Sequence, residues 1–168
     1  QLGRGDSTTR GGGPGEMGDN LAAINLGTGR TATSITTGEG HTCAQLDDNN
    51  VKCWGSGGNG QLGTGKGINL GDGAGEMGDN LAAIELGTGR TARAFVAGYN
   101  HTCAILDDSS IKCFGLNDSG QLGIGDTGNR GDGTNNIGLS EMGDNLPAVD
   151  VGSSGLFIAD GTATVSTL

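Results

Sequence analysis

A long block of this chain occurs twice, sixty residues apart, and a third time in part. Residues 41–53 are HTCAQLDDNNVKC and residues 101–113 are HTCAILDDSSIKC. The segment EMGDNLAAINLGTGRTA at 16–32 returns at 76–92 with one substitution, and a third copy opens at Glu141 as EMGDNLPAVDVG before it diverges. Self-similarity at a period of some tens of residues is typical of solenoids, propellers and other repeat arrays. We expect one continuous repeat domain, in which 1–15 end a preceding repeat, 16–75 and 76–140 form two repeats, and 141–168 form a partial, divergent terminal repeat.

Each full repeat contains four short stretches with the composition of β-strands. They are rich in Val, Ile, Thr or aromatic residues and are bounded by Gly, Asp or Asn. The last two are separated by DDNN in the first repeat and by DDSS in the second, which are polar residues that tolerate hairpin turns. No segment carries the i, i+3, i+4, i+7 apolar spacing of an amphipathic helix, so the chain is predicted to be all-β. The expected strands are Ala22–Leu26, Thr33–Thr37, His41–Leu46 and Val51–Trp54, then Ala82–Leu86, Arg93–Ala97, His101–Leu106 and Ile111–Phe114.

Composition and charge exclude several classes of function. Glycine accounts for 37 of 168 residues, and because these glycines recur at fixed offsets they indicate turns rather than disorder. The formal net charge is −10 without any cluster of Lys or Arg, so the chain would be repelled by phosphate backbones and no nucleic-acid partner is expected. No apolar run approaches the roughly eighteen residues of a transmembrane helix, so no transmembrane segment is predicted.

The four cysteines form two pairs with identical spacing, Cys43 with Cys53 and Cys103 with Cys113. In a hairpin centred near Asp48 the first pair would face each other with Cβ atoms about 4.5–5.5 Å apart, from which modest adjustment gives a disulfide. We predict a disulfide within each hairpin, and hence an oxidising compartment, either extracellular, at the cell surface, or in an organelle lumen. Two alternatives stay open. One is a pair of free buried thiols, and the other is a zinc site that adds a histidine to each cysteine pair but lacks a fixed fourth ligand.

A consensus of the two copies is H-T-C-A-x-L-x-D-x-x-[VI]-K-C-[WF]-G, followed by G-Q-L-G-x-G at 60–65 and 120–125. This pattern resembles the repeat of the regulator-of-chromosome-condensation family, in the cysteine-bearing form of secreted and bacterial-type members, and the resemblance covers nearly all of residues 1–150. It implies a β-propeller, commonly of about seven blades. At sixty residues per blade, 168 residues supply fewer than three. We therefore expect a partial propeller of two to three four-stranded blades with glycine-rich loops, as a segment of a longer protein, an open form covered by partners, or one protomer of an assembly.

Neither a catalytic centre nor a resident cofactor is expected. His41 and His101 occupy the same repeat position, and no nucleophile with a separate base and orienting group accompanies them, so a structural role is predicted. Trp54 and Phe114 are also equivalent and are expected to pack between blades. Acidic residues in glycine-rich turns leave calcium as an alternative, although neither an EF-hand nor a β-solenoid calcium motif occurs. These turns hold Asp19, Asn20, Asp47, Asp48, Asp72, Asp79, Asn80, Asp107, Asp108, Asp126 and Asp132.

The leading hypothesis is a non-enzymatic structural or protein-interaction module, a propeller-type scaffold subunit that presents acidic loops to a protein partner within a larger assembly. Loops 64–75 and 124–140 differ in length between the copies, which in repeat proteins usually marks the binding face. The resemblance implies roles such as exchange factor for small GTPases, enzyme inhibitor or assembly subunit, and the paired cysteines argue against a nuclear exchange factor. The alternative is a calcium- or glycan-binding adhesive module of a cell surface or extracellular matrix. The candidate interaction residues are Lys66, Asn69, Asp72, Asp126, Asn129, Arg130 and Asp132.

Asn100 and Asn117 begin N-glycosylation sequons, which matter only if the chain is secreted. Asn100 begins a predicted strand, whereas Asn117 lies in a predicted turn. We therefore expect Asn117 to be the more accessible of the two candidate glycosylation sites.

Overall fold

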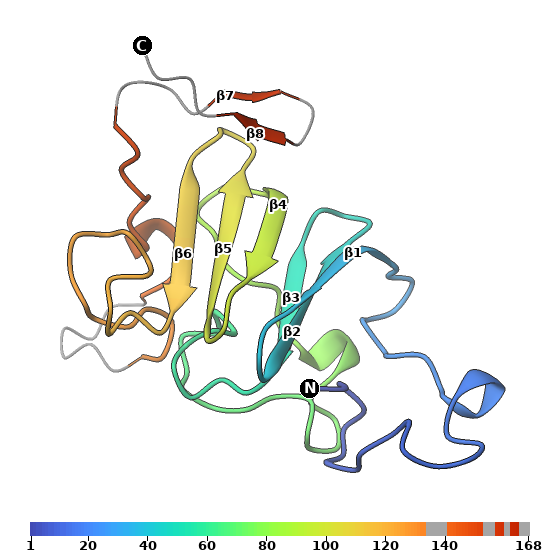
Figure 1. Cartoon of the computed structure of the whole chain (residues 1–168). Helices are drawn as coiled ribbons and strands as arrows, with labels where there is room; N and C mark the ends of the chain where they lie inside the picture. The colour runs from blue at the N-terminus through green and yellow to red at the C-terminus, as the bar shows by residue number, and fades with distance from the viewer. Residues whose placement is uncertain (134–140, 153–156, 160–161, 165–168) are drawn as a thin grey trace.

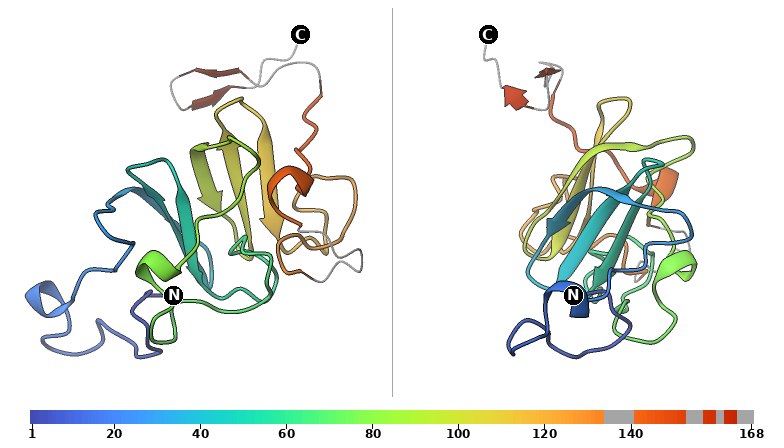
Figure 2. Two further views of the ribbon diagram at one scale, coloured as in Figure 1. Left: turned by 180° about the vertical axis from the view of Figure 1, so that it is seen from behind. Right: turned by 90° about the vertical axis from the view of Figure 1, so that its right-hand side faces the viewer.

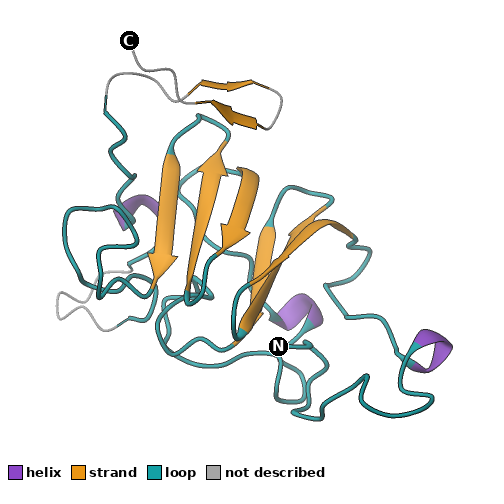
Figure 3. Ribbon diagram, viewed as in Figure 1, coloured by secondary structure: helices purple, strands orange, loops and turns teal. Residues whose placement is uncertain are grey.

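Two three-stranded antiparallel sheets form the body of the molecule (Figures 1 and 3). The computed structural model describes residues 1–133, 141–152, 157–159 and 162–164. Within these residues the strands are joined by loops and single-turn 3-10 helices, without any α-helix, so the prediction of an all-β chain is confirmed. The strands are β1 Ala32–Thr37, β2 His41–Leu46, β3 Val51–Gly55, β4 Ala92–Ala97, β5 His101–Leu106, β6 Ile111–Gly115, β7 Phe157–Ala159 and β8 Thr162–Thr164. The 3-10 helices are η1 Gly18–Asn20, η2 Gly78–Asn80 and η3 Gly143–Asn145.

The tight turn between β2 and β3 brings the first cysteine pair together. Asn49 adopts a left-handed φ of 65°, and Asp48 Oδ1 accepts a hydrogen bond from the Asn50 amide at 3.1 Å. Short polar residues favour both features. The resulting register places Cys43 opposite Cys53, and the second hairpin repeats it. Both predicted disulfides are formed, which removes the free-thiol and zinc alternatives for these cysteines.

The fourth strand predicted at the start of each repeat does not form. Residues 82–86 approach β3 of the preceding sheet, where the Ile84 amide donates to the Val51 carbonyl at 2.8 Å. The next carbonyl, that of Glu85, accepts instead from the Gly143 amide of the following repeat at 2.9 Å. The equivalent residues of the first repeat form no strand either. Backbone groups that a strand would use in a ladder therefore join one repeat to the next, and the sheets have three strands where four were predicted.

The main apolar core lies between the two sheets. β2 is buried along its whole length, whereas β5, its equivalent in the second sheet, alternates between buried and half-buried positions. The cysteine-bearing face of the first sheet packs against the opposite face of the second, so that Cys43, Ala104 and Phe114 share one cluster. Trp54 packs on the other face of the first sheet, with Ala44. Both aromatic side chains are fully buried, as a packing role requires.

The two sheets stand beside each other like neighbouring blades, and the molecule is a partial β-propeller (Figure 2). The cysteine-bearing face of the second sheet remains half-exposed, although the same face of the first sheet is covered. Among the described residues, no helix has the length and apolar character needed to span a membrane.

Candidate functional site: two closed loops

Each sheet ends in a long glycine-rich loop whose two ends are hydrogen-bonded together. In the first repeat, Gly55 exchanges two backbone hydrogen bonds with Leu70, of 2.7 and 3.0 Å. In the second, Gly115 exchanges two with Arg130, of 2.8 and 3.1 Å. Each loop therefore leaves the end of a strand and returns to it, as compact Ω-loops do. We call residues 56–69 the first loop and residues 116–129 the second loop.

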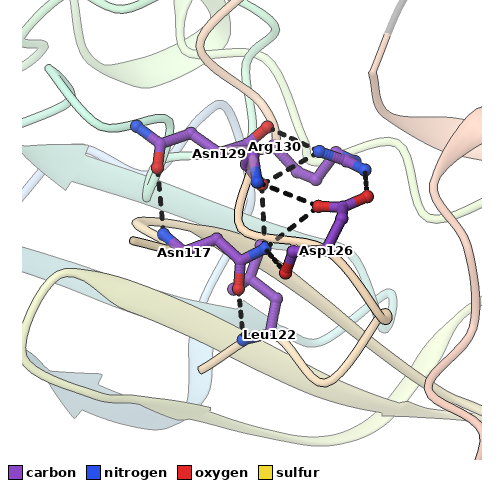
Figure 4. Close-up of polar contacts among 6 residues, drawn as sticks. Asn117, Leu122, Asp126, Asn129 and Arg130 are labelled. Atoms are coloured by element: carbon purple, nitrogen blue, oxygen red, sulfur yellow. Dashed lines mark hydrogen bonds and ion pairs between the residues drawn. The ribbon is translucent and has the colours of Figure 1, made fainter. Parts of the chain in front are cut away.

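The second loop is built around the side chain of Asn117, which is fully buried (Figure 4). Its Nδ2 donates to the carbonyl oxygens of Asp126 and Gly128 at 2.8 and 2.9 Å, and its Oδ1 accepts from the Leu122 amide at 2.9 Å. The Asn117 amide in turn donates to Asn129 Oδ1 at 2.9 Å. One side chain thus satisfies backbone groups at three points of the loop and holds it in one conformation.

The first loop closes without such a central side chain. Gly57 stands where the second loop has Asn117, and a Cβ there would lie 1.9 Å from the Ile68 carbonyl oxygen, so only glycine fits. Asn69 keeps the role of Asn129, because its Oδ1 accepts from the Gly57 amide at 3.1 Å. The two loops therefore share a closing hydrogen bond but differ in what fills their centre.

The first loop lies against the segment that closes and follows the second. A Cβ at Gly60 would be 2.4 Å from the Arg130 carbonyl oxygen, and one at Gly133 would be 2.5 Å from that of Gly65. Only glycine permits backbones to approach so closely. Both loops leave the same end of their sheets (Figure 1), and the first loop contacts the segment that follows the second.

An ion pair stiffens the exposed part of the second loop. The Asp126 carboxylate accepts from the Gly128 amide at 2.9 Å and pairs with the Arg130 guanidinium. The hydrogen bond from Gly128 is the largest cause of the lowered pKa of Asp126, and the Arg130 charge lowers this pKa further. Asp6 and Arg10, at the equivalent positions near the N-terminus, pair at 3.0 Å.

Four of the predicted interaction residues lie in the two loops, and Asp72, Arg130 and Asp132 lie in the segments that directly follow them. Asp132 is buried, because it is only 8% exposed and lies against Gly67 of the first loop. Its carboxylate is therefore largely shielded from solvent, contrary to the prediction. Residues 134–140 of the predicted loop lie outside the described residues. The exposed candidates are Lys66, Asn69, Asp72 and Asp126, and the half-buried ones are Asn129 and Arg130.

The relative exposure of the two sequons is the reverse of the prediction. Asn117 is fully buried and its Nδ2 is used inside the second loop, whereas Asn100 is half-buried. The position of Asn117 in a turn indicated exposure, but the loop that follows encloses the Asn117 side chain.

Two glutamates that the sequence reasoning missed brace the turns after the loops. Glu76 Oε2 accepts from the amides of Gly71 and Gly73 at 2.9 and 2.7 Å. Glu141 Oε2 accepts in the same way from the two equivalent glycines of the second repeat, at 2.9 Å each. The available signal was the position of each glutamate directly before the repeated Met-Gly-Asp-Asn segment.

Asp79, one of the candidate calcium residues, binds the preceding repeat. Its Oδ1 accepts from the Thr28 amide at 2.8 Å and its Oδ2 from the Thr28 hydroxyl at 2.7 Å, and Asp144 contacts Thr88 in the same way. These bonds favour the charged carboxylate and lower the pKa of Asp79 and Asp144. In the part of the chain that the structure describes, no three His, Cys, Asp or Glu side chains are grouped to hold a metal ion.

We expect Thr28→Val to raise the pKa of Asp79 and to leave that of Asp144 unchanged, because it removes one of the two bonds to a single carboxylate. Carbon-detected NMR titration of the side-chain carboxyls measures both values, and Thr88→Val is the matched control with the opposite pattern. Equal shifts at both carboxyls would contradict a local contact. The lowered pKa also implies that this contact stabilises the fold above the ordinary aspartate pKa of about 3.9, and that the contribution is lost as the pH falls through the folded value.

Part of each repeat is similar to a known family of repeats. Residues 32–61 and 92–121 match the Regulator of chromosome condensation (RCC1) repeat. Yeast RCC1 (Prp20), solved bound to Kap60, is similar with a TM-score of 0.44 and 24% identity, over 55% of this chain and 20% of that one. Human WBSCR16 gives a TM-score of 0.45 and 16% identity, over 60% of this chain and 24% of that one. Prp20p of Saccharomyces cerevisiae, described with its binding properties to Gsp1p and histones, gives 0.38 and 24%, over 49% and 19%. The chain spans about a fifth to a quarter of the length of these solved chains.

Proposed function

We propose that this chain, two segments of which match the regulator of chromosome condensation (RCC1) repeat, is a non-enzymatic scaffold that binds a protein partner through the first and second loops. The geometry of the two loops carries this proposal. Each loop is closed at its base by hydrogen bonds, and the second is also held inside by the Asn117 side chain, so little conformational entropy remains to be lost on binding. Loops held by a rigid sheet scaffold are common binding elements.

The surface of the partner that meets the loops is basic, and it includes one acidic patch. Lys66 and Asp126 are exposed on the first and second loops, Asp72 is exposed just after the end of the first loop, and the chain as a whole carries a formal charge of −10. Complementary charge speeds the encounter and selects against acidic partners. The single lysine among the carboxylates fixes where an acidic group of the partner would lie.

The scaffold works in an oxidising compartment as part of a larger assembly. Two disulfides in a chain of this length are typical of extracellular or lumenal proteins. The half-exposed cysteine-bearing face of the second sheet is covered in the assembly by another repeat of the same type, as the second sheet covers that face of the first.

Exchange of two loop charges tests the proposal. In the double variant Lys66→Glu, Asp72→Lys the net charge is unchanged while the signs of the charges at these two positions are exchanged. Arg93→Glu reverses an exposed charge on β4, outside both loops, and is the control for a surface charge change elsewhere. Immobilised chains are incubated with secreted proteins, and captured proteins are quantified by mass spectrometry and then titrated singly. We expect capture to fall at least about tenfold for the loop variant and to persist for the control. Equal capture by the loop variant and the wild type would overturn the proposal.

A calcium titration separates the scaffold from the adhesive alternative. A melting temperature that rises with calcium and falls back to its original value with chelator would show that calcium binds the folded state. This result would favour the adhesive alternative. The scaffold hypothesis predicts no such shift.

A further inference from the structure

His41 lies at the junction of the two sheets, with only 1% of its surface exposed. Its Nε2 is 2.9 Å from the hydroxyl oxygen of Thr102 on β5, and this hydroxyl is 3.0 Å from the Gln61 carbonyl oxygen. One chain of contacts therefore joins β2, the second sheet and the first loop. These polar contacts join the two sheets in addition to the apolar core between them.

The hydroxyl of Thr102 determines which nitrogen of His41 carries the proton. The Gln61 carbonyl oxygen can only accept, so the single hydroxyl proton of Thr102 points toward it. The hydroxyl oxygen must then accept from His41, which places a proton on Nε2 and leaves Nδ1 bare. Neutral His41 can therefore donate the hydrogen bond to Thr102 without taking up a second proton.

A second proton on His41 has no suitable place in this junction. Nδ1 is buried and has no hydrogen-bond partner among the described residues. The glycines of the two strand turns enclose this side of the ring, since a Cβ at Gly38 would lie 2.6 Å from Nδ1 and 2.4 Å from the Gly98 carbonyl oxygen. A charged imidazole here would be desolvated, and its new N–H would have to find an acceptor.

The titratable groups around the junction give the charged form of His41 little support. On the second sheet His101 is such a group, and its charge disfavours a second cation. On the strand turns, the Glu39 carboxylate accepts a hydrogen bond from the Tyr99 hydroxyl, and both residues are exposed. Burial is the largest cause of the lowered pKa of His41, followed by the charge of His101.

We propose that His41 is a pH-sensitive interlock between the two sheets, which joins them while neutral and loosens the junction when it takes up a proton in mildly acidic solution. The folded pKa lies below the unfolded value of about 6.5, so the unfolded chain binds more protons in this range. The stabilisation is therefore complete above about pH 6.5 and is lost as the pH falls toward the folded pKa. In an acidified compartment the two sheets of such a scaffold would separate more readily.

Hydrogen exchange at the sheet junction tests the interlock on the intact chain. Two amides bond across the junction, that of Glu39 to the Tyr99 carbonyl at 3.1 Å and that of Ala97 to the Thr36 hydroxyl at 3.2 Å. After correction for intrinsic exchange, their protection is expected to fall between pH 7 and pH 5. The unfolding equilibrium constant is expected to rise by up to about tenfold per pH unit, the limit for one proton.

The matched variants are His41→Gln and His101→Gln. Glutamine keeps a donor for Thr102 and takes up no proton, so His41→Gln is expected to abolish the pH dependence, whereas His101→Gln retains it. If His41→Gln fails to fold, an NMR titration of wild-type His41 decides: His41 must titrate below the ordinary histidine pKa of about 6.5. Titration of His41 at or above about pH 6.5, or an unchanged pH dependence in His41→Gln, would overturn the proposal.

Discussion

Replacement of Asn117 by alanine is expected to destabilise the chain by about 3 kcal/mol, because three backbone groups of the second loop lose their partner at once. A buried polar group left without a partner costs about 1–3 kcal/mol, and water entering the emptied space recovers part of this. Urea unfolding followed by circular dichroism measures the change through the shift of the midpoint. Exchange of the Leu122 amide should accelerate more than that of amides in β5, since its acceptor is the Asn117 side chain.

Ser119→Ala is the control for this prediction. It removes the same glycosylation sequon but leaves the Asn117 side chain in place, so a change below about 0.5 kcal/mol is expected. Asn117→Asp keeps the size and Oδ1 but turns a second oxygen toward two carbonyl oxygens, and is expected to be at least as destabilising as alanine. If Asn117→Ala were as stable as Ser119→Ala, the side chain would not hold the loop.

Mild reduction is expected to open the Cys103–Cys113 disulfide at least about tenfold faster than Cys43–Cys53. Thiol–disulfide exchange requires a thiolate to reach a sulfur. Cys103 is half-exposed on the open face of the second sheet, whereas Cys43 and Cys53 are 0% and 1% exposed between the sheets. Timed reduction followed by alkylation and mass spectrometry resolves the two pairs.

The energetic effect of opening should be similar for the two disulfides. Each closes a loop with a sequence separation of 10, for which the chain-entropy estimate is about 3 kcal/mol. The double variant Cys103→Ala, Cys113→Ala is the control, and its remaining disulfide should be reduced at the slow rate of the wild type. Loss of both pairs at one common rate would mean that reduction proceeds only through global unfolding, and the prediction would be wrong.

The hairpins were predictable because everything that forms them is local. The turn residues and both cysteines of a hairpin lie within thirteen positions, and alternation along a strand states which side chains share a face. The predicted fourth strand was wrong for the opposite reason. Residues 82–86 have a suitable composition, but the Glu85 carbonyl finds its partner in the next repeat, and local composition carries no information on that choice.

The exposure of some candidate residues was predictable, whereas the way the loops are held was not. Loop length and charge indicated Lys66, Asp72 and Asp126, which are exposed. The burial of Asn117 was missed, because a polar residue in a turn ordinarily faces water. The one clue was the exchange of this residue for Gly57 in a loop that is otherwise similar.

Repetition and local spacing by themselves determined the all-β class, the two hairpins and the pairing of the cysteines. Only the tertiary structure decided which face of each sheet is covered and which side chains meet across repeats. His41 contacts Thr102 over a separation of 61 residues, and Asp79 contacts Thr28 over 51. Because the repeats are nearly identical in sequence, their sequence pattern does not specify which face of one sheet packs against which neighbouring sheet. That choice arises from the burial of one sheet against the next, and it gives equivalent residues unequal environments.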